Sequence, residues 1–97
     1  MEPSEVVTLI RKEKGLSQTD FAKLIGLTQA AISNIEAGKK QPHRSTIEKI
    51  CRATAFPEIW FDLLTADESN MEGAARERFE LVGRNIKDLI IQSLKIA

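Results

Sequence analysis

The chain has 97 residues, of which 42% are hydrophobic and 29% are charged, and its formal net charge at pH 7 is zero. This apolar content suffices for one small helical core, and no run approaches the roughly 18 apolar residues that a membrane span needs. Because no signal-peptide pattern precedes the first helix and there is a single cysteine, we expect a cytoplasmic protein without an internal disulfide.

The first strongly marked element is a helix that begins after Ser17 and ends near Ile25. The Ser17 hydroxyl can accept a hydrogen bond from the first turn, where Asp20 places negative charge at the positive end of the dipole. Gly26 supplies the conformational freedom that a sharp reversal needs. Apolar residues recur at helical spacing and predict one apolar side, formed by Phe21, Ala22, Leu24 and Ile25.

A second short helix is predicted over residues 28–37, with Thr28 as its cap and Gly38 as the residue just past its end. Its inward side is predicted to consist of Ala31, Ile32 and Ile35. Its outward side carries Gln29, Ala30, Ser33 and Asn34, with Glu36 as the only charge. A solvated helix usually carries lysine and glutamate there, so residues 17–38 have the pattern of a DNA-reading helix-turn-helix.

The outward side chains of this second helix suit the edges of bases. Gln29 can pair with the N6 and N7 atoms of adenine, and Ala30 can meet the methyl group of thymine. Ser33 and Asn34 can reach an adjacent base or a phosphate. We therefore expect these four residues to read the DNA sequence.

At these positions the chain resembles the lambda-repressor-like (Cro and repressor, XRE) family of helix-turn-helix DNA-binding proteins. The resemblance covers roughly residues 6–64 and rests on Arg11 with the following KEKGLSQ, Phe21-Ala22, Ile25-Gly26, Thr28-Gln29, Ile32-Ser33, Ile35-Glu36, Gly38-Lys39 and Pro42. It implies an all-α fold, in which a five-helix DNA-binding domain (residues 1–64) places its third helix in the major groove.

The resemblance also assigns individual roles. Gln18 is similar to the family glutamine that touches phosphate, and Gln29 to the one that reads a base. Thr28 is expected to contact the DNA backbone. Arg11 and Glu36 are similar to a family pair that joins the first and third helices, which implies a structural ion pair. The alternative is that both are ordinary surface charges, worth at most about 1 kcal/mol as a pair.

A polar loop follows the second helix of the motif, and Pro42 interrupts any helix there. Its position just past the reading helix suits contacts with the DNA backbone, for which we expect Lys39, Lys40 and Arg44. The alternative for each is a solvated loop residue. His43 is read as a loop residue rather than a ligand or base.

Two further helices complete the predicted domain. Ser45 and Glu48 form a capping box that opens the fourth helix, whose buried stripe is predicted to be Ile47, Ile50, Cys51 and Thr54. Many relatives read Ala-Leu-Gly-Val at the next junction, but this chain reads ATAFP at residues 53–57, so a longer or differently turned junction is expected. Pro57 suits the first position of the fifth helix, onto which we expect Phe56, Trp60, Leu63 and Leu64 to pack.

Residues 65–70 are polar and predict a linker, and residues 71–97 predict one long amphipathic helix. Its apolar stripe comprises Ala75, Phe79, Val82, Ile86, Leu89 and Ile96, widened by Ile90 and Leu94. Such a helix either folds back on the domain or packs against a second chain. We favour a homodimer, with the interface formed by Phe79, Val82, Ile86, Leu89 and Ile90, because helix-turn-helix repressors usually read two half-sites.

The zero net charge conceals an asymmetry between the two parts of the chain. Residues 1–55 hold nine basic and six acidic side chains, whereas residues 56–97 hold five basic and eight acidic ones. The basic part is therefore expected to face phosphate, and the acidic part to face a partner or solvent.

The leading hypothesis is a sequence-specific regulator that binds double-stranded DNA, of phage or prophage repressor type, acting on a palindromic operator. An antitoxin with a toxin partner, or a restriction-modification controller, uses the same fold and stays open. A helical protein-interaction module is a further alternative. An enzyme is disfavoured, because no catalytic set, metal-ligand cluster or phosphate loop is present in the sequence, and no cofactor is expected.

Overall fold

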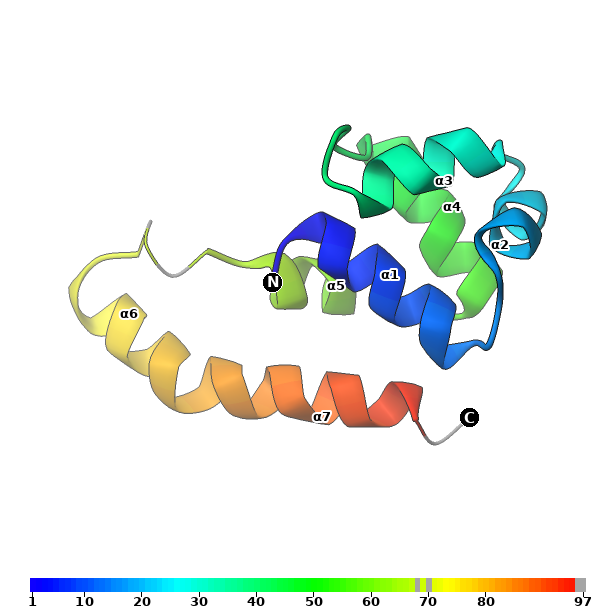
Figure 1. Ribbon diagram of the computed structural model, residues 1–97. Coiled ribbons are helices and arrows are strands. Elements are labelled where there is room, and N and C mark those ends of the chain that lie inside the picture. The colour runs from blue at the N-terminus through cyan, green and yellow to red at the C-terminus, as the bar shows by residue number, and fades with distance from the viewer. Residues whose placement is uncertain (68, 70, 96–97) are drawn as a thin grey trace.

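The computed structural model describes residues 1–67, 69 and 71–95, and these form helices and connecting segments without a strand (Figure 1). The first part of the chain contains α1 (Pro3–Glu13), α2 (Gln18–Ile25), α3 (Gln29–Glu36), α4 (Arg44–Thr54) and α5 (Glu58–Thr65). It is followed by α6 (Gly73–Arg78), a π-helical segment η2 (Phe79–Gly83) and α7 (Arg84–Leu94). The predicted all-α class, with five helices and a C-terminal helical segment, is confirmed.

Short-range capping bonds set the bounds of the two central helices, as predicted. The Ser17 hydroxyl accepts from the N–H of Asp20, and the Thr28 hydroxyl accepts from the N–H of Ala31, at 3.1 Å in each case. Gly26 closes α2 in the left-handed conformation, with φ of 83°. An L side chain there would be strained, so glycine makes the tight reversal into α3 possible.

One core joins the helices α1 to α5 to the end of the C-terminal tail, which consists of α6, η2 and α7. Its buried members are Val6, Val7, Ile10, Phe21, Ala22, Ile25, Ile32, Ile35, Ile47, Ile50, Cys51, Phe56, Phe61, Leu64, Ile90 and Leu94. Leu24, which the sequence placed on the apolar side of α2, is instead 52% exposed. In a two-turn helix the core-facing sector is filled by Phe21, Ala22 and Ile25, and Leu24 lies outside it. On the predicted inward side of α3, Ile32 and Ile35 are buried and Ala31 is half-buried.

The start of α4 differs from the predicted capping box. The helix begins at Arg44 with His43 as its N-cap, and no side chain caps it. Ser45 and Glu48 are exposed residues inside the helix, because a start two residues earlier moves both away from the positions that a capping box requires. The predicted stripe of Ile47, Ile50, Cys51 and Thr54 is buried as expected, and burial raises the pKa of the Cys51 thiol to about 11.

The junction to α5 is short but unusually turned. Ala55 closes α4 in the left-handed conformation, with φ of 54°, although it carries a Cβ atom. Pro57 is the N-cap of α5 rather than its first residue. Phe56 is buried and its ring meets Trp60 edge to face, with centroids 5.7 Å apart. Phe61, for which no role was predicted, is 1% exposed and belongs to the same core.

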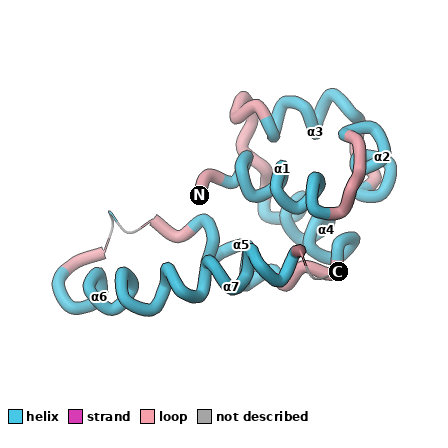
Figure 2. Tube along the Cα trace, turned by 60° about the horizontal axis from the view of Figure 1, so that its bottom comes forward, coloured by secondary structure: helices cyan, strands magenta, loops and turns pink. Residues whose placement is uncertain are grey.

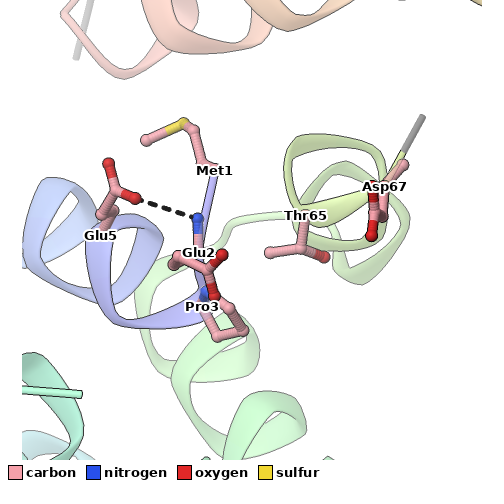
Figure 3. A pocket seen from close by; sticks show the side chains of 7 residues that line it. Met1, Glu2, Pro3, Glu5, Thr65 and Asp67 are labelled. Carbon is pink, nitrogen blue, oxygen red and sulfur yellow. Dashed lines mark hydrogen bonds between the residues drawn. The ribbon is translucent and has the colours of Figure 1, made fainter. Parts of the chain in front are cut away.

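The start of α1 is tied to the end of α5. The ammonium group of Met1 donates to the carbonyl oxygen of Leu64 at 2.9 Å, and the backbone N–H of Glu2 donates to Glu5. Met1, Glu2 and Glu5 line a shallow hollow of about 320 Å³ whose opposite wall is formed by Thr65 and Asp67 (Figure 3). The first and last helices of the five-helix part are thereby brought side by side.

The tail is divided between a packed end and a projecting end. Ile90 and Leu94 of α7 enter the core next to α5, whereas α6 extends beyond the bundle in both views (Figures 1 and 2). Ile90 was predicted to lie in a dimer interface, but it packs inside its own chain. The predicted single α-helix is also interrupted by η2, where the Phe79 ring lies so close to Gly83 that a Cβ atom there would be 2.9 Å from it.

The exposed apolar residues of the tail precede Ile90 in the chain. Leu81, Val82 and Leu89 are 74%, 57% and 64% exposed, and Phe79 and Ile86 are half-buried. The predictions for Glu68 and Asn70 in the linker, and for Ile96 and Ala97 in the tail, concern positions outside the described residues. No helix in the described part of the chain has the length and apolar character to cross a membrane.

Candidate nucleic-acid interface

The outer surface of α3 presents small and amide side chains. Gln29, Ala30 and Asn34 are exposed, and Ser33 is half-buried between them and the bundle. The cap at Thr28 fixes where the helix begins, so Gln29 and Ala30 stand in its first turn. This surface offers hydrogen-bond donors and acceptors without a charge, which is the chemistry that base edges require.

Two glutamines at the starts of α2 and α3 are joined directly. The Nε2 atom of Gln29 donates to the Oε1 atom of Gln18 at 2.8 Å. This bond uses one of the two N–H groups of the Gln29 amide and fixes which way the amide faces. Its Oε1 atom and second N–H stay available, and together they match the N6 donor and N7 acceptor of adenine.

The amide of Gln18 is in turn held by Glu36. Its Nε2 atom donates to the Oε1 atom of Glu36 over 3.5 Å, a long hydrogen bond. Because an amide that donates to a carboxylate must point its nitrogen inward, its oxygen faces Gln29. Gln18 therefore has one N–H left for a phosphate group, and the sequence did not reveal this link between the two glutamines.

Arg11 completes the chain of contacts from the side of α1. Its Nε and Nη2 atoms donate to the two carboxylate oxygens of Glu36 at 2.7 and 2.9 Å, and Nη1 donates to the Leu16 carbonyl at 2.9 Å. The Arg11 and Glu36 side chains are only 13% and 7% exposed. The hydrogen bonds to Glu36 raise the pKa of Arg11 further above its ordinary value. The structure thus brings together the two charges that the resemblance paired.

The loop after α3 places two of the three predicted phosphate-binding cations in solvent. Lys39 and Lys40 are exposed, and their backbone N–H groups both donate to the carbonyl oxygen of Asn34. These bonds hold the loop against the end of α3, with Gly38 in the left-handed conformation at the turn. The backbone of both lysines is therefore held close to the end of α3, and their side chains are free to extend into solvent.

Arg44, the third predicted cation, is engaged by acidic residues of α5. Its Nη2 atom lies 2.9 Å from Asp62, and its Nη1 atom lies 3.3 Å from Glu58. No local pattern predicts this cluster, because the partners are 14 and 18 residues away and meet only through the packing of α4 against α5.

Known proteins match this chain mainly over the part that contains α1 to α5. Residues 8–61 match the family model described as helix-turn-helix. The HTH-type transcriptional regulator PuuR of Escherichia coli K12 is 42% identical over 52 residues, 54% of this chain and 28% of PuuR. The ImmF control region 10 kDa protein of Bacillus phage phi105 is 42% identical over 40 residues, 41% of this chain and 44% of that protein.

A third relative matches over more of its length. The antitoxin HipB of Escherichia coli O6:H1 is 30% identical over 77 residues, which are 79% of this chain and 79% of HipB. The chain spans only a little over a quarter of the length of PuuR. No solved structure gave a significant match.

Replacing Arg11 with methionine is expected to lower the free energy of unfolding by about 1.5–3 kcal/mol, because the nearly buried Glu36 carboxylate loses two charge-assisted hydrogen bonds. Urea unfolding followed by circular dichroism measures the change. The control is Arg76→Met, which removes an exposed pair with Glu80 at 3.7 Å and should cost less than about 1 kcal/mol. Unchanged stability together with weakened DNA binding would show that the pair is not structural.

Proposed function

The chain belongs to the lambda-repressor-like (XRE) helix-turn-helix family of DNA-binding proteins, and from this premise we propose that it is a sequence-specific transcriptional regulator. In this proposal α3 enters the major groove, where Gln29 and Ala30 read bases and Ser33 and Asn34 reach an adjacent base or phosphate. Gln18, Thr28, Lys39, Lys40 and Arg44 hold the DNA backbone. The observation that carries the proposal is the Gln29 amide, exposed on α3 and oriented by Gln18.

We further propose that the regulator acts as a repressor, since a protein bound across a promoter blocks it by occupancy. The phage control-region relative supports a phage or prophage type. The antitoxin relative, matched over most of its length, supports a second candidate, an antitoxin that regulates its own operon. Purification from the native host distinguishes the two, because an antitoxin retains a second protein, whereas a repressor does not need one.

Selection of DNA from a random pool tests the proposed function directly. We expect enrichment of a site with two inverted half-sites whose centres are about one helical turn apart. The result reports sequence preference, symmetry and spacing together. If no sequence is enriched and no DNA fragment is bound in a salt-dependent way, the chain is a protein-interaction module instead.

Gln29→Ala is expected to weaken binding to the selected site by about 1–3 kcal/mol and to relax the preference at a single base pair. The physical reason is the loss of the paired donor and acceptor that match adenine. Titration of each single-base variant of the site measures the effect. Thr19→Ala, at an exposed α2 residue with no proposed role, is the control. An equal loss over every DNA sequence would make Gln29 a phosphate contact.

Dimerisation through the tail is proposed from its exposed apolar residues. Val82 and Leu89 are exposed, and Phe79 and Ile86 line an open apolar groove of about 570 Å³ together with Leu63. A second copy would cover this surface and place two α3 helices on one face of the DNA. Ile90 is not part of this surface, because it is buried in its own chain.

Sedimentation at micromolar concentration is expected to give a dimer. Leu89→Glu should shift the protein to a monomer, because the new charge would be buried between the two tails. Leu24→Glu adds the same charge at another exposed leucine, on α2, and should leave the dimer unchanged. A monomeric native chain would exclude this interface.

A further inference from the structure

An exposed arginine at the start of α4 is held by two carboxylates of another helix. The Nη2 atom of Arg44 is 2.9 Å from Asp62, and its Nη1 atom is 3.3 Å from Glu58. Arg44 is the first residue of α4, and its N-cap His43 belongs to the loop that follows α3. The single positive charge of this arginine is thus paired with two negative charges, next to the surface proposed to face DNA.

The position of Arg44 relative to α3 is defined by the packing around it. Thr46 of α4 and His43 of the loop line one shallow hollow together with Leu27, Ala31 and Ile35, which belong to α3 or immediately precede it. The start of α4 therefore lies beside the inward side of α3, directly after the loop that carries Lys39 and Lys40. In the proposed function, a backbone phosphate lies within reach of the exposed Arg44 side chain.

The ion pairs that hold Arg44 are solvated. The Arg44 side chain is 54% exposed, and those of Glu58 and Asp62 are 42% and 50% exposed. Water and salt weaken such pairs, so their geometry is readily exchanged for another anion. A phosphate offers the same bidentate geometry as a carboxylate to the guanidinium group, and the high charge density of DNA favours the exchange.

We infer that Glu58 and Asp62 set the DNA affinity of this protein by competing with a backbone phosphate for Arg44. In the free protein the arginine is bound to α5, and on DNA it transfers to the phosphate and leaves the two carboxylates in solvent. The inference rests on the proposed DNA-binding function and names two residues on α5 that tune it. Neither carboxylate touches DNA, so both act as positioning residues through Arg44.

The arrangement has a physical consequence for specificity. Backbone contacts add affinity for every sequence, whereas base contacts add affinity for one. A cation that is already paired contributes less to binding of any sequence. The two acidic residues therefore lower nonspecific binding more than they lower discrimination by Gln29.

The test uses the full chain and the DNA site obtained by selection, with affinity measured between 50 and 300 mM salt, a range that changes phosphate contacts strongly (about tenfold or more). Glu58→Gln with Asp62→Asn is expected to bind at least about threefold more tightly at low salt, and to steepen the salt dependence by up to about one unit. Glu48→Gln with Glu72→Gln removes the same charge at exposed positions that do not contact Arg44, and serves as the matched control. Circular dichroism verifies that each variant is folded, and Asp62→Asn alone replaces the double variant if it is not.

The same pair of substitutions is then placed in an Arg44→Ala background. There the proposal requires that affinity and salt slope no longer respond to them. An equal gain in that background, or in the control variant, would show that the acids act only through net charge. No gain, or a loss of affinity, would show that they fix α4 to α5 and leave Arg44 without a role on DNA. Failure of the proposed function has a different signature, since the native chain would then bind no DNA at any salt concentration.

Discussion

The contact on which the proposed DNA-facing surface depends is the bidentate ion pair between Arg11 of α1 and Glu36 of α3. Two charge-assisted hydrogen bonds of 2.7 and 2.9 Å fix the end of α3 against α1, and a third, from Arg11 to the carbonyl of Leu16, fixes the turn into α2. Because both side chains are almost buried, neither is easily replaced by water. The pair thus determines how α2 and α3 sit on the rest of the bundle.

From this pair a line of polar contacts leads outward to the surface. Glu36 accepts from Gln18, and Gln18 accepts from Gln29, so the orientation of an exposed amide is traced back to a nearly buried charge. An amide fixed before binding loses less conformational entropy when it meets a base. The proposed reading residue is therefore preorganised by the same interaction that stabilises the fold.

The acidic half of the chain has two physical roles in this picture. Its buried apolar residues, from Phe56 to Leu94, complete the core that supports the helix-turn-helix. Its surface carries the carboxylates that pair with Arg44 and the exposed leucine and valine side chains of the tail. The proposed reading residues thus lie in the first part of the chain, and the proposed contacts with a second copy lie in its last part.

The sequence by itself determined α2, the turn and α3, because caps such as Ser17 and Thr28 and the spacing of Phe21, Ile25, Ile32 and Ile35 act within one or two helical turns. Apart from the Arg11–Glu36 pair, which the family resemblance implied, only the tertiary structure decided which charges and amides meet. The Gln18–Gln29 bond spans 11 residues and the Arg44–Asp62 pair 18, and both depend on helix packing. Packing likewise placed Ile90 in the core and left Leu89 exposed, since an apolar stripe specifies that a helix must be covered but not by what.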